Sequence, residues 1–317
     1  MEYRRLGDAG MKVSAVSLGG WINFGEGKVE QDAARKVVET AYEHGINFFD
    51  IADVYGTGEA EKQMGAVLKQ YPRHRLVIST KVFGPMSDDI NDRGLSRKHI
   101  FESIDKSLAR IGTDYIDIYF CHRPDTDTPI IETARAMNDL ITAGKVHYWG
   151  TSEWSAAQVT EAHEICLRYG WNPPKTEQPQ YSMLYRERVE NEILPVTDAR
   201  GIGLVVFSPL AQGMLTGKYD NGVPEGSRFA RETWARDRFI NDDNAQAVRS
   251  LKPIADDLGI TRSQLALAWA LRQPGVSSVI IGATRTDQVV DNAKAADVKL
   301  SADVLKAIDE ALAPAAS

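Results

Sequence analysis

The stretch "KVHYWGTSEWSAAQVTEAHEICLRYG", residues 145–170, decides the fold class of the chain. Its first part, residues 145–152, is apolar and β-prone, which predicts a buried strand. Ser155 and Gln158 then have the spacing of a capping box, which predicts the start of a helix. A strand followed by a capped helix is the unit from which α/β folds with a parallel sheet are built.

The same unit recurs along the chain. Ser96 and Gly112 bound one further predicted helix, Gly45 ends another, and a Thr261/Gln264 capping box opens a third. The segment at 175–178 has weak β propensity and is included for its spacing. Alternation of eight strands with helices predicts a (β/α)8 TIM barrel, one domain over residues 1–317. The other predicted strands cover residues 13–20, 47–52, 76–82, 115–122, 203–209 and 277–283.

Two segments stand apart from this alternation. Residues 2–14 have the pattern of a β-hairpin with a glycine-containing turn, which we expect to plug one end of the barrel. Residues 213–241 form a long, Gly-rich and basic interval, and such loops in compact domains are usually functional. A solvated insertion is the alternative. The basic residues of the interval are Lys218, Arg228, Arg231, Arg236 and Arg238.

Composition excludes several classes of protein. The formal net charge of −7 argues against a general nucleic-acid binder, and no apolar run approaches the length of a membrane span. The N-terminus is polar and unlike a signal peptide. Cys121 and Cys166 have no metal-ligand spacing, so no metal is expected, and they suit a reducing, cytoplasmic compartment.

Chemically active residues stand where the predicted strands end, and barrel enzymes place their active sites at that end of the sheet. Asp50, Lys81 and His122 each follow an apolar run, and Tyr55 lies in the loop after Asp50. Taken alone, each has a purely structural interpretation. Asp50 could form a turn, Lys81 could extend to solvent, and His122 could be a hydrogen-bonded loop residue. Their convergence on one rim is harder to explain by structure alone.

The chemistry of this set is that of carbonyl reduction. A Lys81 ammonium would lower the pKa of the Tyr55 phenol, and Asp50 would hold Lys81 in place. Tyr55 could then donate a proton to a forming alkoxide while His122 donates a hydrogen bond to the substrate oxygen. The hydride must come from a cofactor, because no side chain supplies one.

A dinucleotide would have to bind to the loops of the barrel itself. The stretch "GTGEAE", residues 56–61, fails as a Rossmann fingerprint at its third glycine. The stretch "IIGATRTDQVVDN", residues 280–292, ends a strand at Gly282 and starts a helix near Thr284, as in a phosphate site, although a plain turn is equally compatible. Arg285 adds a charge that favours a 2′-phosphate and hence NADP(H).

The motifs together resemble the aldo-keto reductases, and especially the branch of potassium-channel β subunits and their microbial relatives. The resemblance covers essentially the whole chain, in order. It rests on "GINFFDIADVYGTGEAEKQMG", "STKV", "HRPD", "WGTS", "EQPQYS", "FSPLAQGMLTGKY" and "IIGATRTDQVVDN".

The resemblance implies roles for particular residues. Asp50, Tyr55, Lys81 and His122 would be the catalytic tetrad, with Tyr55 as the proton donor. An NADP(H) site would use Gly20, Trp21, Asp50, Ser152, Gln178, Phe207, Ser208, Pro209, Leu210, Gly213, Lys218, Arg228, Gly282, Thr284, Arg285, Gln288, Asp291 and Asn292. A carbonyl substrate would contact Trp21, Phe24, Tyr55, Phe83 and His122. Glu153 and Gln288 depart from residues common in the family, which leaves their roles open.

Three functions compete on this basis. The first is an NADPH-dependent reductase of aldehydes and ketones. The second is a cofactor-binding regulatory subunit of a channel with weak reductase activity. The third is a lyase or isomerase that uses Lys81 as a Schiff base, but it leaves residues 280–292 unexplained. The sequence leaves homo-oligomerisation, the substrate and any channel-like partner open.

Overall fold

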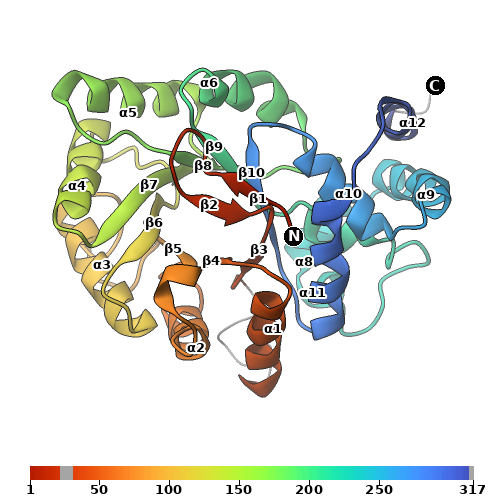
Figure 1. The fold of residues 1–317 in the computed structure, drawn as a ribbon, viewed down its shortest axis with the longest axis horizontal. Coiled ribbons are helices and arrows are strands. Elements are labelled where there is room, and N and C mark those ends of the chain that lie inside the picture. The colour runs from red at the N-terminus through yellow and green to blue at the C-terminus, as the bar shows by residue number, and fades with distance from the viewer. Residues whose placement is uncertain (22–30, 314–317) are drawn as a thin grey trace.

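Eight parallel strands close into a barrel in the computed structural model, which describes residues 1–21 and 31–313. The strands follow one another around the barrel in chain order, and β10 closes it by pairing with both β9 and β3 (Figure 1). The predicted (β/α)8 fold is therefore confirmed. The strands are β3 Val16–Gly19, β4 Phe48–Asp50, β5 Val77–Val82, β6 Ile116–Cys121, β7 Val146–Ser152, β8 Thr176–Gln178, β9 Gly203–Val206 and β10 Val276–Ile281.

Helices surround this barrel on the outside (Figure 1). The predicted caps are in place. Ser96 accepts a hydrogen bond from the backbone of His99, and both capping boxes, Ser155/Gln158 and Thr261/Gln264, form. The helices between and after the barrel strands are α1 Gln31–Glu43, α2 Glu59–Leu68, α3 Arg97–Ile111, α4 Ile130–Thr142, α5 Ala156–Tyr169, α6 Leu194–Asp198, α9 Asp242–Asp257, α10 Arg262–Leu271, α11 Thr286–Ala293 and α12 Ala302–Leu312.

The N-terminal hairpin closes the end of the barrel where the strands begin. Strand β1 Tyr3–Arg5 pairs antiparallel with β2 Lys12–Ser14, as predicted, and the pair lies across the middle of the barrel in Figure 1. Leu6 is fully buried in one cluster with Phe48 and Val77, the first residues of β4 and β5. The hairpin therefore plugs this end, and the opposite rim remains for a site.

The predicted strand at 13–20 proves to be two strands. Residues 12–14 belong to the hairpin, and the barrel strand starts only at Val16. Ala15 makes the change of partner, because its N–H bonds to the Glu2 carbonyl of the hairpin at 2.9 Å while its carbonyl accepts from Val279 of β10 at 2.9 Å. Both bonds join residues distant in sequence, so a local pattern does not show the break.

Short helices occupy part of the long basic interval predicted at 213–241. They are η3 Ala211–Thr216, α7 Arg228–Arg231 and α8 Thr233–Phe239. Strand β9 ends at Val206, earlier than the predicted residue 209, and Ser208 then takes a left-handed backbone with φ of 55°. The interval thus leaves the barrel at the rim where β9 ends.

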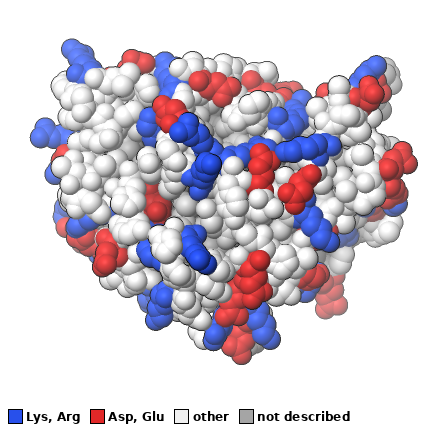
Figure 2. All heavy atoms as spheres, viewed as in Figure 1, with Lys and Arg blue, Asp and Glu red and all other residues white. Residues whose placement is uncertain are grey.

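The surface that carries the hairpin bears both signs of charge (Figure 2). Ion pairs tie the hairpin region to the rest of the molecule. Asp8 bonds Lys175 at 2.8 Å, and Glu2 bonds Lys299 at 2.8 Å. None of the helices in residues 1–21 and 31–313 combines the length and the apolar character of a membrane span.

Candidate active site

The predicted active residues meet at the rim opposite the hairpin because each stands at or just after the end of its strand. Asp50 is the last residue of β4, Lys81 lies one residue before the end of β5, and His122 follows β6. Ser152 and Gln178 end β7 and β8. Since parallel strands in a closed barrel end at one rim, these side chains converge.

Asp50 and Lys81 form a buried ion pair. The Lys81 Nζ lies 2.6 Å from Asp50 Oδ2 and also donates to the Ile51 carbonyl at 2.7 Å. The Lys81 residue is 0% exposed. Burial lowers the pKa of Lys81 from its ordinary value, while the Asp50 carboxylate opposes that shift. The two hydrogen bonds therefore hold the Lys81 amine in one fixed position at the centre of the site.

Tyr55 and His122 complete the group. Their rings meet edge to face with centroids 5.6 Å apart, and the Lys81 Nζ lies 5.1 Å from the centroid of the Tyr55 ring. Burial, helped by the Asp50 carboxylate, raises the pKa of Tyr55 well above its ordinary value. The sequence-based expectation of a lowered pKa is thus wrong for this structure, because burial and the carboxylates of Asp50 and Asp53 raise the pKa of Tyr55 more than the Arg123 cation lowers it.

His122 is held in its neutral form. Burial lowers the pKa of His122 well below its ordinary value, and the cations Lys81 and Arg123 add to the effect. A neutral imidazole carries one N–H and can donate a single hydrogen bond. His122 is therefore suited to orienting a ligand oxygen rather than to supplying a positive charge.

Two polar neighbours of this group went unnoticed in the sequence. Ser79 donates its hydroxyl to Asp50 Oδ1 at 2.6 Å. Arg123 donates to the His122 carbonyl at 2.5 Å and to the Ser152 hydroxyl at 3.3 Å. Ser79 stands two residues before Lys81 and so lies on the same face of β5. This two-residue spacing could have identified Ser79 from the sequence. Arg123 directly follows His122 in the "HRPD" motif.

Gln178 lies where it was expected but contacts an unexpected partner. Its side-chain amide donates to Asp50 Oδ1 at 3.1 Å. Ser152 donates to the Gln178 carbonyl at 2.9 Å. Asp50 thus accepts hydrogen bonds from Lys81, Ser79 and Gln178, and the three donors fix the carboxylate on both of its oxygens.

Glu153, whose role the sequence left open, has a structural contact. It adopts a left-handed backbone with φ of 59°, and its Oε1 accepts the backbone N–H of Gln180 at 2.7 Å. Arg188 lies 3.4 Å from the same oxygen. Glu153 therefore joins the segments that follow β7 and β8.

The segment after β9 forms a cradle with cations beside it. Ser208, Ala211, Gln212 and Gly213 all have positive φ, between 47° and 96°. A Cβ at Gly213 would lie only 3.0 Å from the Lys218 Nζ, so the glycine lets that amine approach the backbone. Because lysine and arginine are the cations that bind phosphates, this donor set fits a pyrophosphate group.

Hydrogen bonds link three side chains across this cradle. Gln212 donates its amide to the Ser208 hydroxyl at 2.5 Å, and Arg228 donates to Gln212 Oε1. Burial lowers the pKa of Arg228 from its ordinary value. Phe207, Pro209 and Leu210, also predicted for the cofactor, belong to the same segment. Arg228 thus contacts the segment after β9 through the Gln212 side chain.

The predicted adenosine end lies around α11. The backbone N–H of Thr284 bonds Gln288 Oε1 at 2.8 Å, so Gln288 closes the turn before the helix. Arg285 pairs with Asp287, with both of its bonds at 3.0 Å, and both side chains are exposed. Gly282 is exposed at the rim.

Asp291 and Asn292 face inward from α11. Asp291 accepts from Thr261 at 2.9 Å and from Gln264 at 2.8 Å, which ties α11 to the start of α10. Asn292 is buried. Asp291 thus has structural contacts with α10, and the role of Asp291 and Asn292 toward a cofactor stays a prediction.

Two of the aromatic residues predicted for the substrate, Trp21 and Phe83, lie just after barrel strands. Gly20 is buried and Trp21 is 37% exposed after the end of β3, with the Trp21 ring centroid 5.9 Å from that of Trp234 on α8. Phe83, which follows β5, is partly buried against the core. Phe24 lies outside the described residues.

Comparison with known proteins decides the family. A family model described as "Aldo/keto reductase family" matches residues 15–313. The chain belongs to the aldo/keto reductase family. Membership in this family implies oxidoreductase activity, and aldo/keto reductases generally use a nicotinamide cofactor.

Two plant proteins are similar to this chain over most of their lengths. A protein of Arabidopsis thaliana, named "Probable voltage-gated potassium channel subunit beta", is 49% identical over 305 residues, covering 94% of this chain and 92% of its own. A protein of Oryza sativa subsp. japonica with the same name is 46% identical, with coverage of 94% and 92%. The predicted resemblance to the channel-subunit branch is confirmed.

Proposed function

We propose that this aldo/keto reductase reduces aldehydes or ketones to alcohols with NADPH as the hydride donor. The observation that carries the proposal is the buried Lys81, fixed 2.6 Å from Asp50 and 5.1 Å from the Tyr55 ring centroid, with His122 against the edge of Tyr55. An acid, a fixed cation and a neutral hydrogen-bond donor meet where a carbonyl oxygen would gain charge.

Tyr55 is the proton donor in this proposal. A phenol with a raised pKa keeps its proton at neutral pH and gives it up only to a strong base. An alkoxide that forms from a carbonyl is such a base. The buried Lys81 ammonium stabilises the negative charge as it develops, and it favours the phenolate that remains.

His122 orients the substrate. Because its pKa is lowered, its ring is neutral and donates one hydrogen bond to the carbonyl oxygen. Asp50 keeps Lys81 in position, and Ser79 and Gln178 keep Asp50 in position. These residues act on the oxygen atom and on its proton.

NADPH, when bound, supplies the hydride. Ser152 and Gln178 would hold its carboxamide, Phe207 would pack on its ring, and Gly20 and Trp21 would lie beside it. Ser208, Lys218 and Arg228 would hold the pyrophosphate. Residues around Gly282, Thr284, Arg285 and Gln288 would hold the adenosine end.

Parallel assays with the two cofactors test the proposal. A panel of aldehydes and ketones is offered to the purified protein with NADPH or NADH, and cofactor oxidation and alcohol formation are followed. The proposal predicts steady turnover with simple aldehydes. At low cofactor concentration the rate with NADPH should be higher than the rate with NADH. Stoichiometric cofactor binding with no alcohol formed from any of them would contradict it.

A second function is favoured by one specific observation. Relatives of 46% and 49% identity carry the name of a potassium-channel β subunit. A regulatory subunit that binds cofactor with weak turnover would share the barrel. Negligible turnover, together with capture of a purified channel domain in a pull-down, would support this function over the first.

The burial of Lys81 argues against a Schiff-base enzyme. The amine is fully buried and already bonded to Asp50 and to the Ile51 carbonyl, so it presents no free approach to a substrate carbon. Borohydride treatment with a carbonyl substrate should therefore leave Lys81 unmodified.

A further inference from the structure

Asp53 is a buried carboxylate to which the proposed chemistry gives no task. It is 0% exposed and stands two residues before Tyr55. Its Oδ1 accepts the backbone N–H of Val54 at 2.6 Å, and its Oδ2 accepts the Ser103 hydroxyl of α3 at 3.0 Å. One side chain therefore bonds the backbone next to Tyr55 on one side and a rigid helix on the other.

The opposite side of this turn is also held. Gly84, just after Phe83, lies so close to Val54 that a Cβ at Gly84 would come within 2.8 Å of the Val54 Cγ2. The N–H of Gly94 bonds the Phe83 carbonyl at 2.8 Å, which closes residues 83–94 into a loop. The turn that carries Tyr55 is thus wedged between this loop and α3.

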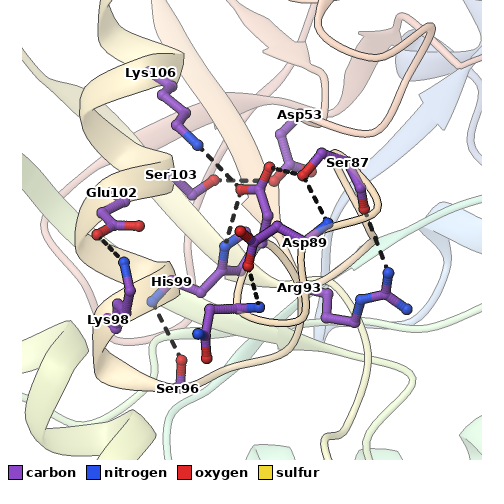
Figure 3. Close-up of polar contacts among 12 residues, drawn as sticks. Asp53, Ser87, Asp89, Arg93, Ser96, Lys98, His99, Glu102, Ser103 and Lys106 are labelled. Atoms are coloured by element: carbon purple, nitrogen blue, oxygen red, sulfur yellow. Dashed lines mark hydrogen bonds and ion pairs between the residues drawn. The ribbon is translucent and has the colours of Figure 1, made fainter.

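The same face of α3 holds that loop (Figure 3). Asp92 accepts from Lys106 of α3 at 3.0 Å and from Ser87 at 2.9 Å, and it lies 3.6 Å from the Nδ1 of His99. Since His99, Ser103 and Lys106 stand three or four residues apart, they line one face of the helix. That face contacts both Asp53 and Asp92.

We propose that Asp53 and Ser103 position the turn that carries Tyr55, and that Asp92 holds the Phe83 loop on the same face of α3. Both are positioning roles that act through Tyr55 and Phe83, and they rest on the proposed function. The first contact sets the proton donor and so governs kcat. The second sets a wall of the substrate site and so governs KM.

Hydrogen bonding, rather than charge, is the property of Asp53 that matters here. Burial and the nearby Glu61 raise the pKa of Asp53 to about 7. A carboxyl group with a pKa of about 7 is partly protonated at physiological pH. Its negative charge is therefore not always present, and charge alone cannot hold the Tyr55 turn in place. An asparagine can accept from Val54 and donate to Ser103, whereas an alanine can do neither.

The test measures kcat and KM for one aldehyde at saturating NADPH in four variants. Asp53→Ala and Ser103→Ala should lower kcat by about 10-fold or more with KM little changed, since small displacements of a catalytic group cost up to about 10²-fold. Asp53→Asn should keep kcat within about threefold of wild type. Asp92→Ala should mainly raise KM, and a wild-type KM in this variant would overturn the role of Asp92.

Ser107→Ala is the matched control. Ser107 is buried on α3 one turn after Ser103 and bonds Arg110, not the Tyr55 turn. It should keep wild-type kcat. Thermal melting and NADPH fluorescence titration check that each variant folds and binds cofactor. If Asp53→Ala does not fold, Ser103→Ala and Asp53→Asn decide the matter.

Three results would overturn the role of Asp53 and Ser103: wild-type kcat in Ser103→Ala, an equal loss in Ser107→Ala, or a loss in Asp53→Asn as large as in Asp53→Ala. Tyr55→Phe separates this from a failure of the proposed function. If Tyr55→Phe is inactive while Ser103→Ala is normal, only the positioning role falls. If Tyr55→Phe remains active, Tyr55 is not the proton donor, whereas the proposed function itself falls only if the wild-type protein forms no alcohol.

Discussion

Single residues at the rim act through burial more than through the charges beside them. The Tyr55 phenol lies 5.1 Å, ring centroid to Nζ, from the Lys81 cation, yet its pKa is raised. Asp50 neutralises that cation at 2.6 Å and adds its own negative field. A phenol with a raised pKa stays protonated at neutral pH and can still protonate an alkoxide, which is the stronger base.

Arg285 carries the prediction about cofactor choice. Its pair with Asp287 is exposed, and such pairs are worth only about 0–1 kcal/mol, so the guanidinium can turn to a 2′-phosphate at small cost. Arg285→Ala should weaken NADPH binding by about 10- to 150-fold, since a charge-assisted hydrogen bond is worth roughly 1.5–3 kcal/mol. NADH should be affected far less. Fluorescence titration of both cofactors measures this.

Asp287→Ala is the matched variant, because it frees Arg285 without removing it. It should bind NADPH at least as tightly as wild type. Equal losses for NADPH and NADH in Arg285→Ala would mean that the side chain only shapes the turn before α11.

At the scale of the elements, the sequence predicted what local chemistry decides. The caps at Ser96 and Ser155 were readable because cap and partner lie within three residues. The separation of β2 from β3 was not, because it depends on Val279. The bond from Gln178 to Asp50 likewise joins residues of different strands through their side-chain conformations.

The contribution of the hairpin to the stability of the fold can be measured. Leu6 is fully buried in the cluster that closes the barrel. Leu6→Ala should lower the free energy of unfolding by about 2–5 kcal/mol, as core truncations do. Urea denaturation measures it. The kcat of the folded variant should stay unchanged, since the site lies at the other rim, and a large loss of kcat without loss of stability would contradict this view.

At the scale of the whole molecule, the barrel separates stability from chemistry. The hairpin lies across one end of the barrel (Figure 1). At the other end, Asp50, Lys81 and His122 stand at or just after the ends of β4, β5 and β6. The sequence predicted this division, because strand ends and the barrel rule were enough. It could not predict buried groups such as Glu177, whose surroundings come from packing.

Glu177 makes stability depend on pH. It is 0% exposed and accepts from Thr151, while its Oε1 finds no hydrogen-bond partner among the described residues. Burial raises the pKa of Glu177 to about 8. The folded protein therefore keeps a proton that the unfolded chain loses above about pH 4.3, so this contribution to stability falls as pH rises toward 8.

Glu177→Gln removes that dependence. The free energy of unfolding of the variant minus that of wild type should increase from pH 5 to pH 8, by up to about 4 kcal/mol. Urea denaturation at both pH values measures the difference, and Glu187→Gln, at an exposed position, is the control. A constant difference between Glu177→Gln and wild type across this range would show that Glu177 does not titrate there.

The most direct test of the central claim is the kcat of Tyr55→Phe with a simple aldehyde and NADPH. The change removes only the phenol oxygen, so NADPH affinity, measured by fluorescence in the same preparation, should stay nearly the same. The kcat should fall by about 10²- to 10⁴-fold, the usual contribution of a general acid. A fall of less than about tenfold, with cofactor binding intact, would show that Tyr55 is not the proton donor and would contradict the account.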